Sequence, residues 1–173
     1  HPSEGIRSAK SRLLEGKRIV LGITGSIAAV ECFELARELI RHGAEVRAVM
    51  SPEALKLVTP DAMHFATGHE VITSLDGRTQ HVDLLGGYDD HVAVHGEPLS
   101  KMALGIDDTA VTTMATVAIG GGIPVLVAPA MHASMLNHPA VRKNMDYLRE
   151  MGVGFIGPRM EEKKAKVASV EEI

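Results

Sequence analysis

Short apolar runs alternate with amphipathic stretches from about residue 17 onward. The first apolar run, residues 18–21, leads into a glycine turn at residues 22–29 and then into a segment with apolar residues at helical spacing, which stops at Gly43. A second strand is predicted at residues 45–50, after this glycine. A strand, a helix and a strand in this order form a βαβ unit, so we expect the two strands to be parallel.

The alternation continues through the rest of the chain. The clearest buried strand is the run from Pro124 to Pro129, and a last strand is predicted at residues 153–156. Further helices are predicted to begin at capping residues, namely Ser51, Thr59, Asp107 or Asp108, and Asn137 with Pro139. This order predicts an α/β fold, a three-layer Rossmann-like (flavodoxin-like) open parallel sheet with helices on both faces.

Two regions fit this pattern less well. Residues 91–95 alternate weakly after a polar stretch, whereas a central parallel strand is usually a nearly continuous apolar run. Residues 1–16 carry Ile6, Ala9, Leu13 and Leu14, a spacing that predicts a short amphipathic helix. We therefore expect a helical lead-in at residues 1–16 and one domain at residues 17–173, and the helix signal near its end suggests the N-terminal part of a longer chain.

Composition narrows the classes of function. The net charge is −4 with no block of like charges, which argues against nucleic-acid binding and against a basic membrane patch. No apolar segment approaches the roughly 20 residues of a membrane span. The single cysteine, Cys32, cannot form an internal disulfide, and it shares a predicted helix face with Ala29 and Ala36. We expect a cytoplasmic protein in which Cys32 is a core residue.

The glycine turn is the first candidate for ligand binding. Its N–H groups at Ser26 to Ala28 open a helix and lack intrahelical partners, so they suit a phosphate. Glycine turns also occur as plain connections, and that reading stays open. The spacing Gly22, Gly25, Ala28 lacks the third glycine of a dinucleotide fingerprint, which favours a mononucleotide. The strand ends at residues 22–28, 51, 95–98 and 129–132 should converge at one edge of the sheet.

Several ordered blocks together carry a family resemblance. They are Gly-Ile-Thr-Gly-Ser-Ile-Ala-Ala at 22–29, Arg-His-Gly-Ala-Glu-Val at 41–46, His-Val-Asp-Leu at 81–84, Gly-Ile-Asp-Asp at 105–108, Pro-Ala-Met-His at 129–132 and Lys-Ala-Lys-Val-Ala-Ser at 164–169. With these blocks the chain resembles the flavin-dependent cysteine decarboxylases, in particular the archaeal phosphopantothenoylcysteine decarboxylase domain. The resemblance implies FMN-dependent decarboxylation of 4'-phosphopantothenoylcysteine to 4'-phosphopantetheine in coenzyme A biosynthesis, by a carboxy-lyase.

The resemblance also implies roles for individual residues. The FMN phosphate would lie on Gly25, Ser26 and Ile27, with help from Ser51, Pro52 and Glu53, and Ala130 would lie near the ring system. His81 matches the family's catalytic histidine and would serve in proton transfer after the flavin has oxidised the substrate thiol. Met131 and His132 match a motif that binds the substrate carboxylate, with His132 in place of an asparagine.

The chain departs from the family pattern at three places. The flavin-contacting block Ala-Pro-(Ala-Thr or Leu-Ser)-Ala-Asn-Thr has no match at residues 93–98. This loop has changed, or flavin is handled differently, or the reading frame has slipped locally, since codons for His-Gly-Glu can read Thr-Ala one frame away. The flap region, residues 161–166, lacks the family's cysteine, and residues 87–89 replace a Trp-Ala-Asp block.

Other functions stay open beside the decarboxylase. One is a flavoprotein reductase or electron carrier on the same fold, and another is a flavin-free domain with a role in assembly. Metal binding by His91 and His95 with His132 or His138 is a weaker alternative, and we expect no metal. The resemblance further implies a homo-oligomer, a trimer or a multiple of three, and a fused ligase domain.

Overall fold

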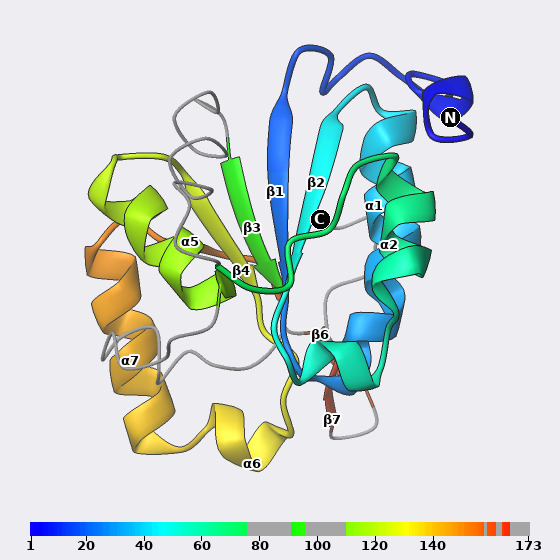
Figure 1. Ribbon diagram of the computed structural model, residues 1–173. Coiled ribbons are helices and arrows are strands. Elements are labelled where there is room, and N and C mark those ends of the chain that lie inside the picture. The colour runs from blue at the N-terminus through cyan, green and yellow to red at the C-terminus, as the bar shows by residue number, and fades with distance from the viewer. Residues whose placement is uncertain (76–90, 96–109, 158, 162–163, 167–173) are drawn as a thin grey trace.

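The computed structural model describes residues 1–75, 91–95, 110–157, 159–161 and 164–166 (Figure 1). Five parallel strands form the main sheet, and they are β1 (Arg18–Ile23), β2 (Glu45–Met50), β3 (His91–His95), β4 (Val125–Ala128) and β5 (Gly154–Phe155). Their order across the sheet is β2-β1-β3-β4-β5. The predicted parallel pairing of the first two strands is confirmed. The order reverses direction between β1 and β3, where open α/β sheets place their ligands.

Helices cover both faces of this sheet. One layer holds α1 (Cys32–Arg41) and α2 (Pro60–Thr67), and the other holds α5 (Ala110–Gly120) and α7 (Pro139–Glu150) (Figure 1). Each layer closes its own apolar core against the sheet, with Leu21, Ile40 and Met63 in one and Val20, Met114 and Leu148 in the other. The predicted three-layer architecture is therefore confirmed. Among the described residues, no helix has the length and apolar character needed to cross a membrane.

Short helical turns complete the described elements. They are the 3₁₀ turns η1 (Glu4–Ile6), η2 (Ile27–Glu31) and η3 (Ala54–Lys56) and the one-turn helix α6 (Ala133–Leu136). Thr59 caps α2 as predicted, since its Oγ1 accepts the Ala62 N–H at 3.2 Å. The cap of α7 differs from the prediction. His138, rather than Asn137, is the N-cap, and its Nδ1 accepts the Ala140 N–H at 3.2 Å.

The weakly patterned segment at residues 91–95 is the central strand. β3 pairs with β1 on one side and with β4 on the other, in a register that sets His95 beside both Ile23 and Ala128. Its two histidines stand at the first and last positions, so the three residues between them form an uninterrupted apolar run. The histidines at both ends interrupt the nearly continuous apolar signal expected of a central position.

The predicted amphipathic helix at residues 1–16 is wrong. Apart from the three-residue turn η1, this segment is irregular and lies along the end of α1. The N–H groups of Ser8, Lys10 and Leu14 donate to the carbonyls of Ile40, Arg41 and His42 at 3.1, 3.0 and 2.9 Å. A helix end leaves such carbonyls without intrahelical partners, so backbone pairing with them explains the irregular path.

In two further segments the structure differs from the prediction. The predicted strand at residues 71–73 is a single bridge, in which Ile72 pairs with Val49 at the β2 edge. Residues 159–166, expected to be an exposed charged segment, contain β6 (Arg159–Glu161) and β7 (Lys164–Lys166), which pair antiparallel. The helical turn expected at residues 99–104 and the helix start near residue 169 lie outside the described residues.

Candidate functional site

The glycine turn leaves β1 at the point where the sheet order reverses. Ser26 is the N-cap of η2, and its carbonyl accepts the Ala29 N–H at 2.8 Å while its Oγ lies 3.4 Å from the Ala28 nitrogen. The Ser26 N–H donates to the Thr24 carbonyl at 2.8 Å. Since η2 continues directly into α1, the turn stands at the positive end of a helical segment that runs to Arg41.

Two backbone donors of this turn have no acceptor among the described residues. They are the N–H groups of Gly25 and Ile27, and both residues are exposed, Ile27 by 76%. The third predicted contact, Ser26, has its N–H paired to Thr24, so its hydroxyl is the group that remains to donate. The turn therefore offers two amides and one hydroxyl to an anion, which is the chemistry expected of a phosphate site.

The loop after β2 lies against this turn. Ser51 is buried, its N–H donates to the Ile23 carbonyl at 2.9 Å, and its Oγ lies 3.3 Å from the Ala54 nitrogen. A Cβ added at Gly25 would stand 2.3 Å from the Glu53 Cβ, so only glycine permits this approach. Pro52 and Glu53 are exposed, and the Glu53 carboxylate pairs with Lys56 at 2.6 Å. Ser51 thus joins the two loops, while the Glu53 charge is drawn to Lys56.

The third group of predicted residues follows β4. Ala130 and Met131 are buried, and His132 is an exposed N-cap of α6 whose Nδ1 accepts the Ser134 N–H at 3.3 Å. Because Nδ1 accepts this hydrogen bond, the single ring proton of a neutral His132 lies on Nε2. His132 is therefore a loop-capping residue that also keeps an N–H donor, as a carboxylate ligand requires.

The sheet register decides which of these residues come together. Ile23 is paired with Met50, so the glycine turn and the Ser51 loop are adjacent. The segment from Ala130 to His132 leaves the same edge of the sheet, but β3 separates it from β1. The predicted catalytic His81 lies outside the described residues, and so do residues 96–98 of the expected flavin block.

Two alternative sites can be compared with the structure. Within the described ranges, no three His, Cys, Asp or Glu residues gather closely enough to hold a metal ion. Cys32 is fully buried in the α1 core, as predicted, and burial raises the pKa of its thiol far above the usual range. That thiol is therefore unsuited to redox work.

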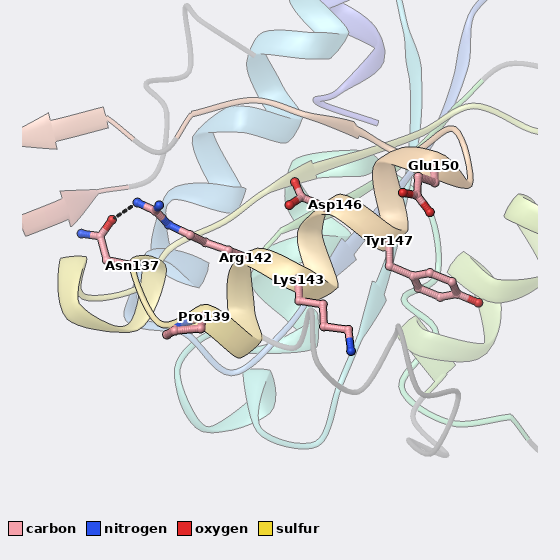
Figure 2. Close-up of a pocket in the computed structure, with 7 residues that line it drawn as sticks. All are labelled: Asn137, Pro139, Arg142, Lys143, Asp146, Tyr147 and Glu150. Atoms are coloured by element: carbon pink, nitrogen blue, oxygen red, sulfur yellow. Dashed lines mark hydrogen bonds between the residues drawn. The ribbon is translucent and has the colours of Figure 1, made fainter.

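A surface pocket of about 610 Å³ lies along the outer face of α7 (Figure 2). It is lined by Asn137, Pro139, Arg142, Lys143, Asp146, Tyr147 and Glu150. Figure 2 shows Arg142 reaching back to the Asn137 side chain, whose Oδ1 accepts from its Nη2 at 2.7 Å. None of the residues predicted as a site from the sequence lines this pocket. It is a feature separate from the strand-end site.

The comparisons with known proteins agree with this arrangement. The family model described as Flavoprotein matches residues 7–173. The chain belongs to the Flavoprotein family. It is 54% identical over 179 aligned residues to the coenzyme A biosynthesis bifunctional protein CoaBC of Thermococcus kodakarensis and 39% identical over 177 to that of Methanocaldococcus jannaschii. Both alignments cover the whole of this chain but only 44% and 43% of the relatives.

A solved structure extends the similarity to the fold. The FMN-dependent cysteine decarboxylase SpaF superposes with a TM-score of 0.76 at 30% identity, over 90% of this chain and 91% of that one. The family resemblance drawn from the ordered blocks is thereby confirmed. The individual site residues stay predictions.

Sequence reasoning missed one contributor to the site. Thr24 is buried at 2% exposure, and its carbonyl holds the Ser26 N–H, so it fixes the shape of the turn. A threonine between two glycines is the signal that could have indicated this role, because a β-branched residue restricts an otherwise permissive turn.

Proposed function

We propose that this chain is an FMN-dependent decarboxylase domain that converts 4'-phosphopantothenoylcysteine to 4'-phosphopantetheine. The observation that carries the proposal is the 54% identity to a bifunctional coenzyme A biosynthesis protein across the whole chain. A domain of this family that covers less than half of its relatives would perform one of their two activities. The FMN-dependent cysteine decarboxylase among the similar structures favours the decarboxylation step.

The residues of the glycine turn fit the phosphate of FMN. The amides of Gly25 and Ile27, which have no acceptor in the part of the chain that the structure describes, and the Ser26 hydroxyl would hold it. The helical segment behind them favours a negative charge. Ser51 would keep the second loop in place through its bonds to Ile23 and Ala54 rather than bind the phosphate directly. Glu53 would contribute its backbone, since its carboxylate is paired with Lys56.

The β4 exit would orient the substrate. Ala130 would lie near the flavin ring, and Met131, which is buried next to it at the strand end, would help to bind the substrate. His132 would donate its Nε2–H to the substrate carboxylate, with its Nδ1 held by Ser134. When bound, FMN supplies the oxidation of the substrate thiol on which loss of carbon dioxide depends. His81 would transfer the proton.

One observation favours a second candidate function. His95 is the last residue of β3 and pairs with Ile23 of β1. The segment that departs from the family's flavin block, residues 93–98, therefore includes the end of β3, at the point between β1 and β3 where the sheet order reverses. A domain that has lost flavin through this change would act in assembly instead. The reductase alternative shares the flavin site and differs only in its reaction.

Further parts of the proposal concern partners and location. The two relatives are named as bifunctional proteins and this chain covers less than half of each, which supports a further domain fused to this one. The family resemblance implies that this domain is a ligase. The homo-oligomeric state, a trimer or a multiple of three, and the cytoplasmic location stay predictions of the same proposal.

The test is an FMN-loaded assay with 4'-phosphopantothenoylcysteine, in which carbon dioxide and 4'-phosphopantetheine are both measured. The decarboxylase reading requires equal amounts of the two products and no external reductant. Flavin that binds but yields neither product would favour the reductase reading. A protein that fails to retain FMN would favour the assembly role.

A further inference from the structure

Helix α7 turns one side toward the apolar core and leaves another side exposed. Val141, Met145 and Leu148 pack in the core. The exposed side lines the surface pocket shown in Figure 2, and its residues follow one another at helical spacing. We call this exposed side the α7 stripe, and it consists of Arg142, Lys143, Asp146, Tyr147 and Glu150.

Charge is segregated along the α7 stripe. Arg142 and Lys143 lie nearer the N-terminal end of the helix, and Asp146 and Glu150 lie nearer the C-terminal end (Figure 2). With two basic and two acidic residues, the stripe has no net charge but has a basic half and an acidic half. Tyr147, which is 50% exposed, adds a half-exposed aromatic ring next to Asp146 in the sequence.

Two of these charges have no partner in the part of the chain that the structure describes. Asp146 pairs with Arg149 at 2.8 Å, whereas Lys143 and Glu150 take part in no hydrogen bond or ion pair there. Lys143 and Glu150 are about 10 Å apart along the helix axis, at 1.5 Å per residue, so they cannot pair with each other. Glu150 also stands four positions from Asp146, where like charges destabilise a helix. A basic group from outside the chain would relieve this repulsion.

A surface that complements the stripe must present basic and acidic groups in the reverse order along its length. The stripe itself, turned end to end, has this order. If two antiparallel copies of α7 meet about a two-fold axis between positions 146 and 147, Lys143 of each copy lies level with Glu150 of the other. Asp146 of each copy then lies level with Tyr147 of the other, whose hydroxyl can donate to the carboxylate. The α7 stripe is therefore self-complementary, as a two-fold contact requires.

We propose that the α7 stripe binds the α7 stripe of a second copy of this chain, antiparallel and about a two-fold axis. Two ion pairs between Lys143 and Glu150 would fix the register, and the two Tyr147 rings would supply apolar contact near the axis. A standard interface buries about 800 Å² on each partner, and a contact made by one helix of 12 residues on each side is expected to be weak and concentration-dependent. The contact involves neither the strand-end site nor flavin, so it does not depend on the proposed function.

The experiment reverses the two unpaired charges. Sedimentation velocity over a range of concentrations gives the mass of the whole chain and its assemblies for the wild type, Lys143→Glu and Glu150→Lys. We expect each substitution to raise the dissociation constant of the two-fold contact at least tenfold, because both ion pairs become like-charge pairs. Arg12→Glu is the matched control, since it reverses a charge on a side chain that is 78% exposed and lies outside the stripe. It should leave the association unchanged.

A mixture of the two variants gives the decisive readout. In a contact between Lys143→Glu and Glu150→Lys, both ion pairs are restored, so the equal mixture should associate about as tightly as the wild type. Salt of about 1 M should weaken the association, because the Debye length is then only about 3 Å. Urea unfolding should give all variants nearly the same midpoint, since these side chains are exposed.

Two results would overturn the inference. One is the same distribution of mass in the wild type and in both single variants. The other is a mixture of the two variants that associates no better than each variant alone. Neither measurement involves FMN or carbon dioxide release, so a failure of the proposed function leaves this test intact.

Discussion

Substitution of Gly25 tests the proposed phosphate site directly. In Gly25→Ala, the new Cβ would lie 2.3 Å from the Glu53 Cβ and 3.3 Å from the Glu53 carbonyl carbon. Carbon atoms pack best at about 3.5–4.0 Å, so the glycine turn and the Ser51 loop must separate by about 1 Å. Overpacking of this kind costs about 1–3 kcal/mol. A separation of 1 Å would also displace the amides that are proposed to hold the FMN phosphate.

The assay has two readouts and an internal check. Urea unfolding gives the stability loss, and flavin fluorescence gives the FMN affinity, which we expect to fall at least tenfold. Gly120→Ala is the control, because a Cβ there meets nothing within 4 Å. The double variant Gly25→Ala with Glu53→Gly removes the closest contact and should recover part of both losses, which a double-mutant cycle would register as coupling. Wild-type affinity and stability in Gly25→Ala would refute the reasoning.

Three further predictions follow from buried or altered groups. Cys32 should resist a thiol reagent in the native protein and react only as the chain unfolds in urea, since its thiol is buried and the pKa is raised; rapid native labelling would contradict this. Hydrogen bonds from Lys10 and, to a smaller extent, from Arg41 hold the pKa of the Glu38 carboxyl below its ordinary value. These ion pairs therefore stabilise the fold at any pH above the pKa of Glu38 in the unfolded chain, and the stabilisation is lost as the pH falls through the lower pKa of the folded state. Glu38→Gln should therefore lower the urea midpoint at pH 7, by an amount that shrinks in acid, and a constant difference would argue against the ion pair. Replacing residues 93–98 by Ala-Pro-Ala-Thr-Ala-Asn-Thr, the family's flavin block, which is one residue longer, should increase FMN retention after gel filtration. Unchanged retention would mean that this segment does not limit flavin binding.

The first half of the sheet was predictable because its signals are local. The run at residues 18–21, the glycine turn and the stop at Gly43 lie within one βαβ unit, and the structure has β1, α1 and β2 there. Thr59 with Pro60 is likewise a complete capping signal within a few residues, and it was confirmed.

The parts that the sequence indicated only weakly, or predicted wrongly, depend on distant partners. Residues 91–95 become the central strand through pairing with β1 and β4, although their own pattern is weak. The lead-in pairs by backbone with the carbonyls at the end of α1, and backbone pairing leaves no trace in the spacing of apolar residues. In the same way, the close approach of Gly25 to Glu53 joins loops that follow different strands. The sequence indicated that the two loops converge, but not that they approach so closely that only glycine fits at position 25.

The hairpin was missed for another reason. Its strands have three residues each and its residues are mostly charged, so a pattern of apolar positions has little to detect. Only the register reveals that Arg159 and Lys166 are opposite each other.

The most direct test of the central claim is the visible absorption spectrum of the purified protein after incubation with FMN and removal of the unbound flavin. We expect flavin bands to stay with the wild-type protein, at one FMN per chain, and to be lost from the Gly25→Ala variant. A colourless wild-type protein would contradict the assignment of the glycine turn as the FMN phosphate site.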